Sequence, residues 1–101
     1  MKETLSVILI AHNEEQAIGP MLEGLLVTYD REILEVIVVD DASTDNTRAI
    51  GESWIKRSPK VRLVERTPAC GVGRALKTGF SSIDPNALRF AWSRKNKCAK
   101  N

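Results

Sequence analysis

The chain has 101 residues, 43% of them hydrophobic and 28% charged, a composition typical of one small globular domain. Its net charge of +2 hides an uneven distribution, because all 13 acidic residues lie at or before Asp84 while five of the 15 basic residues follow it. Five charges without a nucleic-acid-binding motif favour a solvated basic end, so we expect no nucleic-acid partner.

The sequence has neither of the usual signals for membrane insertion or export. No apolar stretch approaches the roughly 18–20 residues of a membrane span, and the first ten residues lack the pattern of a signal peptide. Cys70 and Cys98 are too few and too far apart for a disulfide framework or a zinc site. We therefore expect a cytoplasmic protein without a transmembrane segment, and leave peripheral contact with a membrane open.

The first part of the chain predicts a strand followed by a helix. Residues 6–11 (S-V-I-L-I-A) are apolar on consecutive positions, as in a central strand. Asn13 and Gln16 fit a capping box, although Pro20 allows the helix to begin as late as Ile18. The helix carries one apolar stripe for packing on a sheet, formed by Ile18, Met21, Leu22, Leu25 and Leu26.

The stretch 36–47 (V-I-V-V-D-D-A-S-T-D-N-T) predicts a second buried strand that ends at two carboxylates. Asp40 and Asp41 should point to opposite faces, which makes them a poor pair for one metal ion. Such a pair lets one carboxylate support the loop while the other faces a ligand. The alternative is that both cap the next helix, expected from about Asn46 to Arg57, beside the caps at Ser43 and Asp45.

The later part of the chain continues the same alternation. Residues 61–64 predict a short strand, residues 68–73 a glycine-containing loop, and a stripe from Val72 to Phe80 a third helix. This β-α-β-α-β-α order predicts an α/β fold with a parallel sheet, the front of a nucleotide-binding domain. Residues 88–92 fit either another strand or a helical turn. We expect a domain over residues 1–85 and a poorly ordered basic tail over 86–101.

Polar residues follow each predicted strand, where open α/β sheets bind their ligands. His12 and Glu14 should flank the same crevice as the acidic pair, although a lone histidine is more often a bystander. The run Gly71-Val72-Gly73-Arg74 can bring N–H groups and a guanidinium to a phosphate, or can simply form a turn. No nucleophile stands in a triad-like setting, so we assign no catalytic residue.

Together these motifs resemble family 2 glycosyltransferases of the GT-A fold, from about Leu5 to Phe80. The matching stretches are S-V-I-L-I-A-H-N-E-E, I-G-P-M-L, V-I-V-V-D-D-A-S-T-D-N-T and G-V-G-R-A-L-K-T-G-F. The glycine-rich element is most similar to the branch that makes polyprenyl- or dolichyl-phosphate sugars. The resemblance implies a Rossmann-like half-domain that binds a UDP- or GDP-sugar, and a family reaction of inverting sugar transfer to a lipid phosphate or another acceptor.

The resemblance also implies a role for each matching residue. Asp41 would accept a hydrogen bond from the base, with Asp40 supporting it from behind. The family usually has proline at position 10 and an aromatic residue at position 12, where this chain has Ile10 and His12. The nucleoside pocket would be lined by Ala11, His12 and Glu14. The loop with Gly71, Gly73 and Arg74 would close over the base and the phosphates.

One family feature is not found in the sequence. Family members carry a D-x-D-like motif soon after the glycine-rich helix, which holds a magnesium or manganese ion on the diphosphate, and a general base further on. Here the only acid after Phe80 is Asp84. We therefore expect no metal site in this chain and interpret it as the donor-binding part of a glycosyltransferase, truncated or with its continuation replaced, and inactive alone.

Two other classes of protein fit parts of the sequence. A non-catalytic nucleotide-binding or interaction module would associate with itself or with a partner chain through an exposed sheet edge. A phospho-receiver domain also has an acidic pair at a strand end, but after its first strand and with a later aspartate and lysine. Here the pair follows the second strand, which argues against a receiver.

Overall fold

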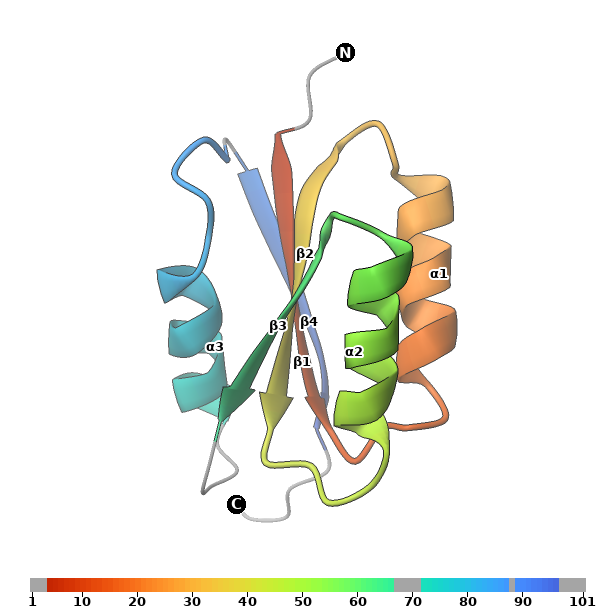
Figure 1. The fold of residues 1–101 in the computed structure, drawn as a ribbon. Helices are drawn as coiled ribbons and strands as arrows, with labels where there is room; N and C mark the ends of the chain where they lie inside the picture. The colour runs from red at the N-terminus through yellow and green to blue at the C-terminus, as the bar shows by residue number, and fades with distance from the viewer. Residues whose placement is uncertain (1–3, 67–71, 88, 97–101) are drawn as a thin grey trace.

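A computed structural model of the chain describes residues 4–66, 72–87 and 89–96. Strands and helices alternate along these residues and build one α/β unit (Figure 1). The elements are β1 (Leu5–His12), α1 (Ile18–Thr28), β2 (Ile33–Asp41), α2 (Thr47–Arg57), β3 (Val61–Arg66), α3 (Val72–Ser81) and β4 (Arg89–Asn96).

The strands form one parallel sheet in the order β3-β2-β1-β4, which confirms the predicted fold class. β1 and β2 are central and buried along almost their whole length. A parallel strand with helices over both faces meets apolar neighbours on both sides. This is why their sequences are continuous apolar runs instead of alternating ones.

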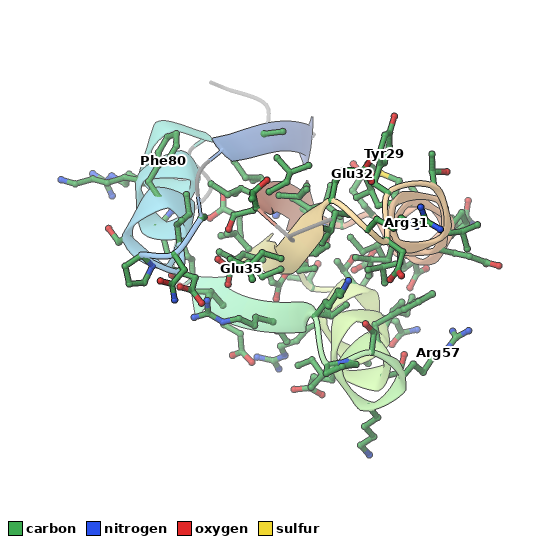
Figure 2. All side chains as sticks on the ribbon, turned by 90° about the horizontal axis from the view of Figure 1, so that it is seen from above. Tyr29, Arg31, Glu32, Glu35, Arg57 and Phe80 are labelled. Carbon is green, nitrogen blue, oxygen red and sulfur yellow. The ribbon has the colours of Figure 1, made fainter. Side chains whose placement is uncertain are left out.

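Helices cover both faces of the sheet, with α1 and α2 on one face and α3 on the other (Figures 1 and 2). The apolar core divides accordingly, following the alternation of side chains along each strand. Val36 and Val38 belong to the cluster that includes Leu22 of α1 and Trp54 of α2. Ile37 and Val39 belong to the second cluster, on the α3 face.

The last strand corrects one expectation drawn from the sequence. Residues 86–101 are expected to form a poorly ordered tail, but Arg89–Asn96 form β4, which runs parallel to β1 from the pair Leu5↔Arg89 to the pair His12↔Asn96. Pairing with the exposed edge of β1 uses backbone N–H and C=O groups and needs no apolar period in the added strand. Leu88, residues 97–101, Gly71 and both cysteines lie outside the described residues.

Candidate functional site

The carboxyl ends of the strands lie together at one edge of the sheet, below the strands in Figure 1. The loops that follow β1 and β2, residues 13–17 and 42–46, meet at this edge. They lie where ligands of open α/β sheets bind, and their polar residues are the ones that the sequence singles out.

Asn13 fastens the first loop to the second. Its backbone has a φ of 55°, a left-handed conformation that asparagine tolerates better than most residues. Its Oδ1 accepts hydrogen bonds from the N–H groups of Thr44 at 2.8 Å and Asp45 at 3.3 Å. The predicted capping box is therefore wrong: α1 begins at Ile18 without a side-chain cap, because the Asn13 side chain serves the neighbouring loop.

Asp45 adds further bonds between the two loops. Its Oδ2 accepts from the N–H of Glu15 at 3.3 Å, and its Oδ1 accepts from the N–H of Thr47 at 2.9 Å. Burial by itself raises the pKa of Asp45, but the hydrogen bonds from the hydroxyl and N–H of Thr47 and the N–H of Glu15 outweigh it and lower the pKa. The carboxylate therefore stays charged and holds the loops in one conformation.

His12 connects the ends of β1 and β2. Its Nδ1 lies 2.7 Å from the carbonyl oxygen of Asp41 and therefore carries the hydrogen of that bond. Nε2 is then an acceptor, 3.4 Å from Nδ2 of Asn13. Ala11, the residue before it, is fully buried and in register with Asp40. The orientation of the imidazole at the crevice is thus fixed by its neighbours.

Asp40 and Asp41 have separate tasks in the structure. Asp40 is 3% exposed, and its Oδ1 accepts from the N–H of Ser43 at 3.3 Å, so it supports the turn. Asp41 is fully buried, with Oδ1 3.3 Å from Nη1 of Arg66 at the end of β3. Arg66 is not predicted from the sequence. Only the strand register, which pairs Arg66 with Asp41 across β2 and β3, indicates that it belongs to the site.

Glu14 is the least satisfied carboxylate of the site. The residue is 8% exposed, and its N–H donates to Oγ1 of Thr47 at 2.8 Å. Among the described residues, Oε2 of Glu14 is buried without a hydrogen-bond partner. Buried polar atoms are almost always paired, so this acceptor has room in its hydrogen bonding for a donor, either a water molecule or a group of a ligand.

Helix α3 begins at the same edge of the sheet. Gly73 and Arg74 lie in its first turn, and the Arg74 side chain is exposed. The N-terminus of a helix carries a partial positive charge that favours anions. Gly71 falls outside the described residues, so two of the three predicted residues of this element are placed.

The part of the chain that the structure describes offers little to a metal ion. Within residues 4–66, 72–87 and 89–96, no three His, Cys, Asp or Glu side chains gather closely enough to hold one. None of the helices described there is long and apolar enough to cross a bilayer.

A family model for glycosyl transferase family 2 matches residues 6–90. The chain is 35% identical over 96 residues to a dolichyl-phosphate beta-glucosyltransferase of Drosophila melanogaster, an alignment that covers 86% of this chain and 29% of the relative. It is 33% identical over 82 residues to a dodecaprenyl-phosphate galacturonate synthase of Rhizobium johnstonii, covering 77% of this chain and 24% of the relative.

The fold also matches a solved structure, a mannosyltransferase from Pyrobaculum calidifontis in complex with GDP-Man and Mn²⁺. The TM-score is 0.70 at 30% sequence identity, over 83% of this chain and 25% of the other. The α/β sheet with its carboxyl-edge loops, together with these matches, shows that the chain belongs to glycosyltransferase family 2. It spans about a quarter of the length of the relatives that it matches.

Proposed function

We propose that this chain binds the nucleotide part of a nucleoside-diphosphate sugar, a UDP- or GDP-sugar, at the carboxyl edge of its sheet. The observation that carries the proposal is the buried, unpartnered Oε2 of Glu14, which lies in the loop joined to the ends of both central strands. A nucleoside supplies N–H and O–H donors that suit such an acceptor. The mannosyltransferase with the similar fold was solved with GDP-Man, which supports the same ligand class.

In this proposal different residues at the carboxyl edge bind different parts of the ligand. Ala11, His12 and Glu14 line the nucleoside pocket, and Asp41 accepts a hydrogen bond from the base, with Asp40 holding the turn behind it. The imidazole of His12 offers a flat face on which the base can stack. Arg74 and the backbone N–H of Gly73 bind the phosphates, and the resemblance implies the same role for Gly71, which lies outside the described residues.

We further propose that the whole protein's reaction is the family's inverting sugar transfer, with a lipid phosphate as the acceptor. The relatives named for dolichyl-phosphate and dodecaprenyl-phosphate products support this acceptor class. The described residues offer no carboxylate set for the metal, so in this proposal these 101 residues bind donor without transferring sugar. Transfer by the 101-residue chain with added manganese would contradict this part.

Calorimetric titration with UDP and GDP tests the binding proposal. Asp41→Asn replaces the charged carboxylate that accepts from the base with a neutral amide, and we expect affinity for the preferred nucleotide to fall about tenfold, the usual effect of losing one charged hydrogen bond. Glu35→Gln is a matched control, because Glu35 is also a buried carboxylate of β2 that is paired with an arginine of β3, but near the amino end of the strand. Equal losses in both variants, or no binding to the folded chain, would contradict the proposal.

A second candidate function, an interaction module, is favoured by one surface. An apolar groove lies between α1 and β4, and Tyr29 at its border is 48% exposed. Exposed apolar surface beside an edge strand often mediates association. Sedimentation across a wide concentration range would detect it, and a strictly monomeric chain would exclude self-association. The groove is lined by Leu5, Val7, Pro20, Met21, Gly24, Leu25, Tyr29 and Ala91.

A further inference from the structure

Thr47 places a hydroxyl group at a fully buried position beside the candidate site. It is the first residue of α2 and is 0% exposed. Its Oγ1 accepts a hydrogen bond from the N–H of Glu14 at 2.8 Å and donates one to Oδ1 of Asp45. Glu14 belongs to the loop after β1 and Asp45 to the loop after β2, so this one hydroxyl joins the two loops.

The donor and the acceptor in each of these bonds are fixed by chemistry. An ionised carboxylate only accepts hydrogen bonds, so the single hydrogen of the Thr47 hydroxyl points to Asp45. The lone pairs of Oγ1 are then left for the N–H of Glu14. The N–H of Thr47 also donates to Oδ1 of Asp45, at 2.9 Å, which holds that carboxylate against the start of α2. The hydroxyl is therefore held in one orientation.

The main chain of Glu14 is held on both sides. Thr47 accepts from its N–H, and its carbonyl oxygen accepts from the N–H groups of Ala17 at 3.0 Å and Ile18 at 2.9 Å, where α1 begins. The side chain differs, because Oε2 is buried without a hydrogen-bond partner among the described residues. Glu14 thus presents an unsatisfied acceptor from a main chain that Thr47 and α1 hold in place.

We propose that Thr47 is a positioning residue of the nucleotide site, whose hydroxyl holds Glu14 where its carboxylate accepts a hydrogen bond from the nucleoside. The inference rests on the proposed function, since it concerns the binding of the same ligand. Affinity rises when supporting hydrogen bonds fix in advance the groups that touch the ligand. Thr47 is fully buried and acts only through Glu14.

Calorimetric titration of two variants with UDP and GDP tests the proposal. Thr47→Val keeps the shape of the side chain but leaves the N–H of Glu14 without its acceptor, so we expect affinity for the preferred nucleotide to fall about tenfold. Thr47→Ser keeps the hydroxyl and should bind within about twofold of the unmodified chain. An equal loss of affinity in the two variants would overturn the proposal.

Ser6→Ala is the matched control for a purely structural effect. Ser6 is also fully buried, and its hydroxyl also donates to a carboxylate, that of Glu35 at 2.7 Å, but at the amino end of the sheet. We expect this variant to lose stability in urea, as Thr47→Val does, and to keep its affinity for nucleotide. A loss of affinity equal to that of Thr47→Val would overturn the proposal.

A double-mutant cycle tests whether Thr47 acts through Glu14. Glu14→Ala removes the carboxylate and leaves the N–H that bonds to Thr47. In that background Thr47→Val should lower affinity for nucleotide by less than about twofold, because no carboxylate is left to position. A further loss of about tenfold would mean that the two residues act independently, which would overturn the proposal.

Hydrogen exchange tests the same bond if Thr47→Val does not fold, as judged by circular dichroism. In the unmodified chain the amide of Glu14 should exchange more slowly than that of its exposed neighbour Gln16, and more slowly again with nucleotide bound. Equal exchange of the two amides would overturn the proposal. Failure of the folded, unmodified chain to bind UDP or GDP would instead remove the proposed function on which the inference rests.

Discussion

Glu35 and Asp41 lie six residues apart on β2, and each is buried and paired with an arginine of β3. Glu35 Oε1 lies 2.7 Å from Nη1 of Arg62, and Asp41 Oδ1 lies 3.3 Å from Nη1 of Arg66. The two pairs stand at opposite ends of the sheet, about 20 Å apart at 3.3 Å per residue. In the proposed function the Asp41 pair belongs to the nucleotide site, while the Glu35 pair at the other end is structural.

The Glu35 pair binds the segment before β4 to the sheet. Besides Arg62, the Glu35 carboxylate accepts from the hydroxyl of Ser6 and from the N–H of Asp84, each at 2.7 Å. Figure 2, which looks down the strands, shows Glu35 among the side chains between the sheet and α3. Glu35→Gln should lower the free energy of unfolding by about 1.5–3 kcal/mol, the range for hydrogen bonds to charged groups. Urea unfolding at pH 7 measures it.

The same pair predicts the pH dependence of stability. Burial raises the pKa of Glu35, but the hydrogen bonds from Asp84, Ser6 and Arg62 outweigh burial, so its pKa in the folded chain lies below the ordinary value of 4.5. A carboxyl group with a lowered folded pKa stabilises fully above the unfolded pKa and loses its effect as the pH falls through the folded value. Stability should therefore drop as the pH falls below about 4.5. Glu35→Gln should reduce that slope; an unchanged slope would contradict the assignment.

Ala42, in the turn after Asp41, has a φ of 60°, which costs an L-residue about 1–2 kcal/mol. Ala42→Gly removes that strain, but the greater freedom of glycine in the unfolded chain costs about 0.5–1 kcal/mol, so we expect a net gain of about 0–1.5 kcal/mol. The same substitution at Ala49, exposed within α2, should destabilise by about 1 kcal/mol. Thermal unfolding of both variants tests whether their changes in stability have opposite signs. Equal destabilisation of the two variants would rule out strain at Ala42.

Gly79 lets α3 approach the sheet closely. A Cβ at this position would lie 2.5 Å from Cγ2 of Ile8 in the buried cluster of that face. Gly79→Ala should therefore destabilise by about 1–3 kcal/mol through overpacking. Gly24→Ala, in α1 with nothing within 4 Å of the new Cβ, should stabilise by about 0.5–1 kcal/mol. A stabilised Gly79→Ala would show that α3 does not pack at this distance.

Asn13 should affect both stability and nucleotide binding. Asn13→Ala removes the acceptor for the N–H groups of Thr44 and Asp45 and leaves a left-handed backbone without asparagine, a loss of about 2 kcal/mol. Since these bonds hold the two loops of the crevice together, affinity for nucleotide should fall as well. Asn46→Ala is the control, because Asn46 makes no side-chain capping bond at the start of α2. Equal effects of the two variants would count against the loop network.

The elements that the sequence predicts well are those whose burial leaves a local pattern. The apolar runs of β1 and β2 and the stripes of α1 to α3 need no distant information to be recognised. The sequence also predicts that His12 and Asp41 lie at one edge of the sheet, because parallel strands bring their carboxyl ends together. The family resemblance added roles for these residues that spacing alone does not give.

The features that the sequence does not reveal depend on partners far along the chain. The pairing of Arg66 with Asp41 and of Arg62 with Glu35 follows from strand register, which no local pattern encodes. The sequence does not predict that β4 continues to Asn96, because an edge strand is held by backbone hydrogen bonds and needs no apolar pattern. The predicted capping box at Asn13 is wrong because the Asn13 side chain accepts hydrogen bonds from the loop after β2 instead.

Nuclear magnetic resonance mapping of the nucleotide site tests the central claim most directly. Backbone amide shifts are followed while UDP, and then GDP, is added to the chain. We predict that one nucleotide perturbs residues 11–14, 40–47 and 72–74 at the carboxyl edge and spares residues 34–36, 60–62 and 82–84 at the amino edge. Perturbations confined to the amino edge or to the apolar groove between α1 and β4, or no perturbation by either nucleotide, would contradict a donor site at the carboxyl edge.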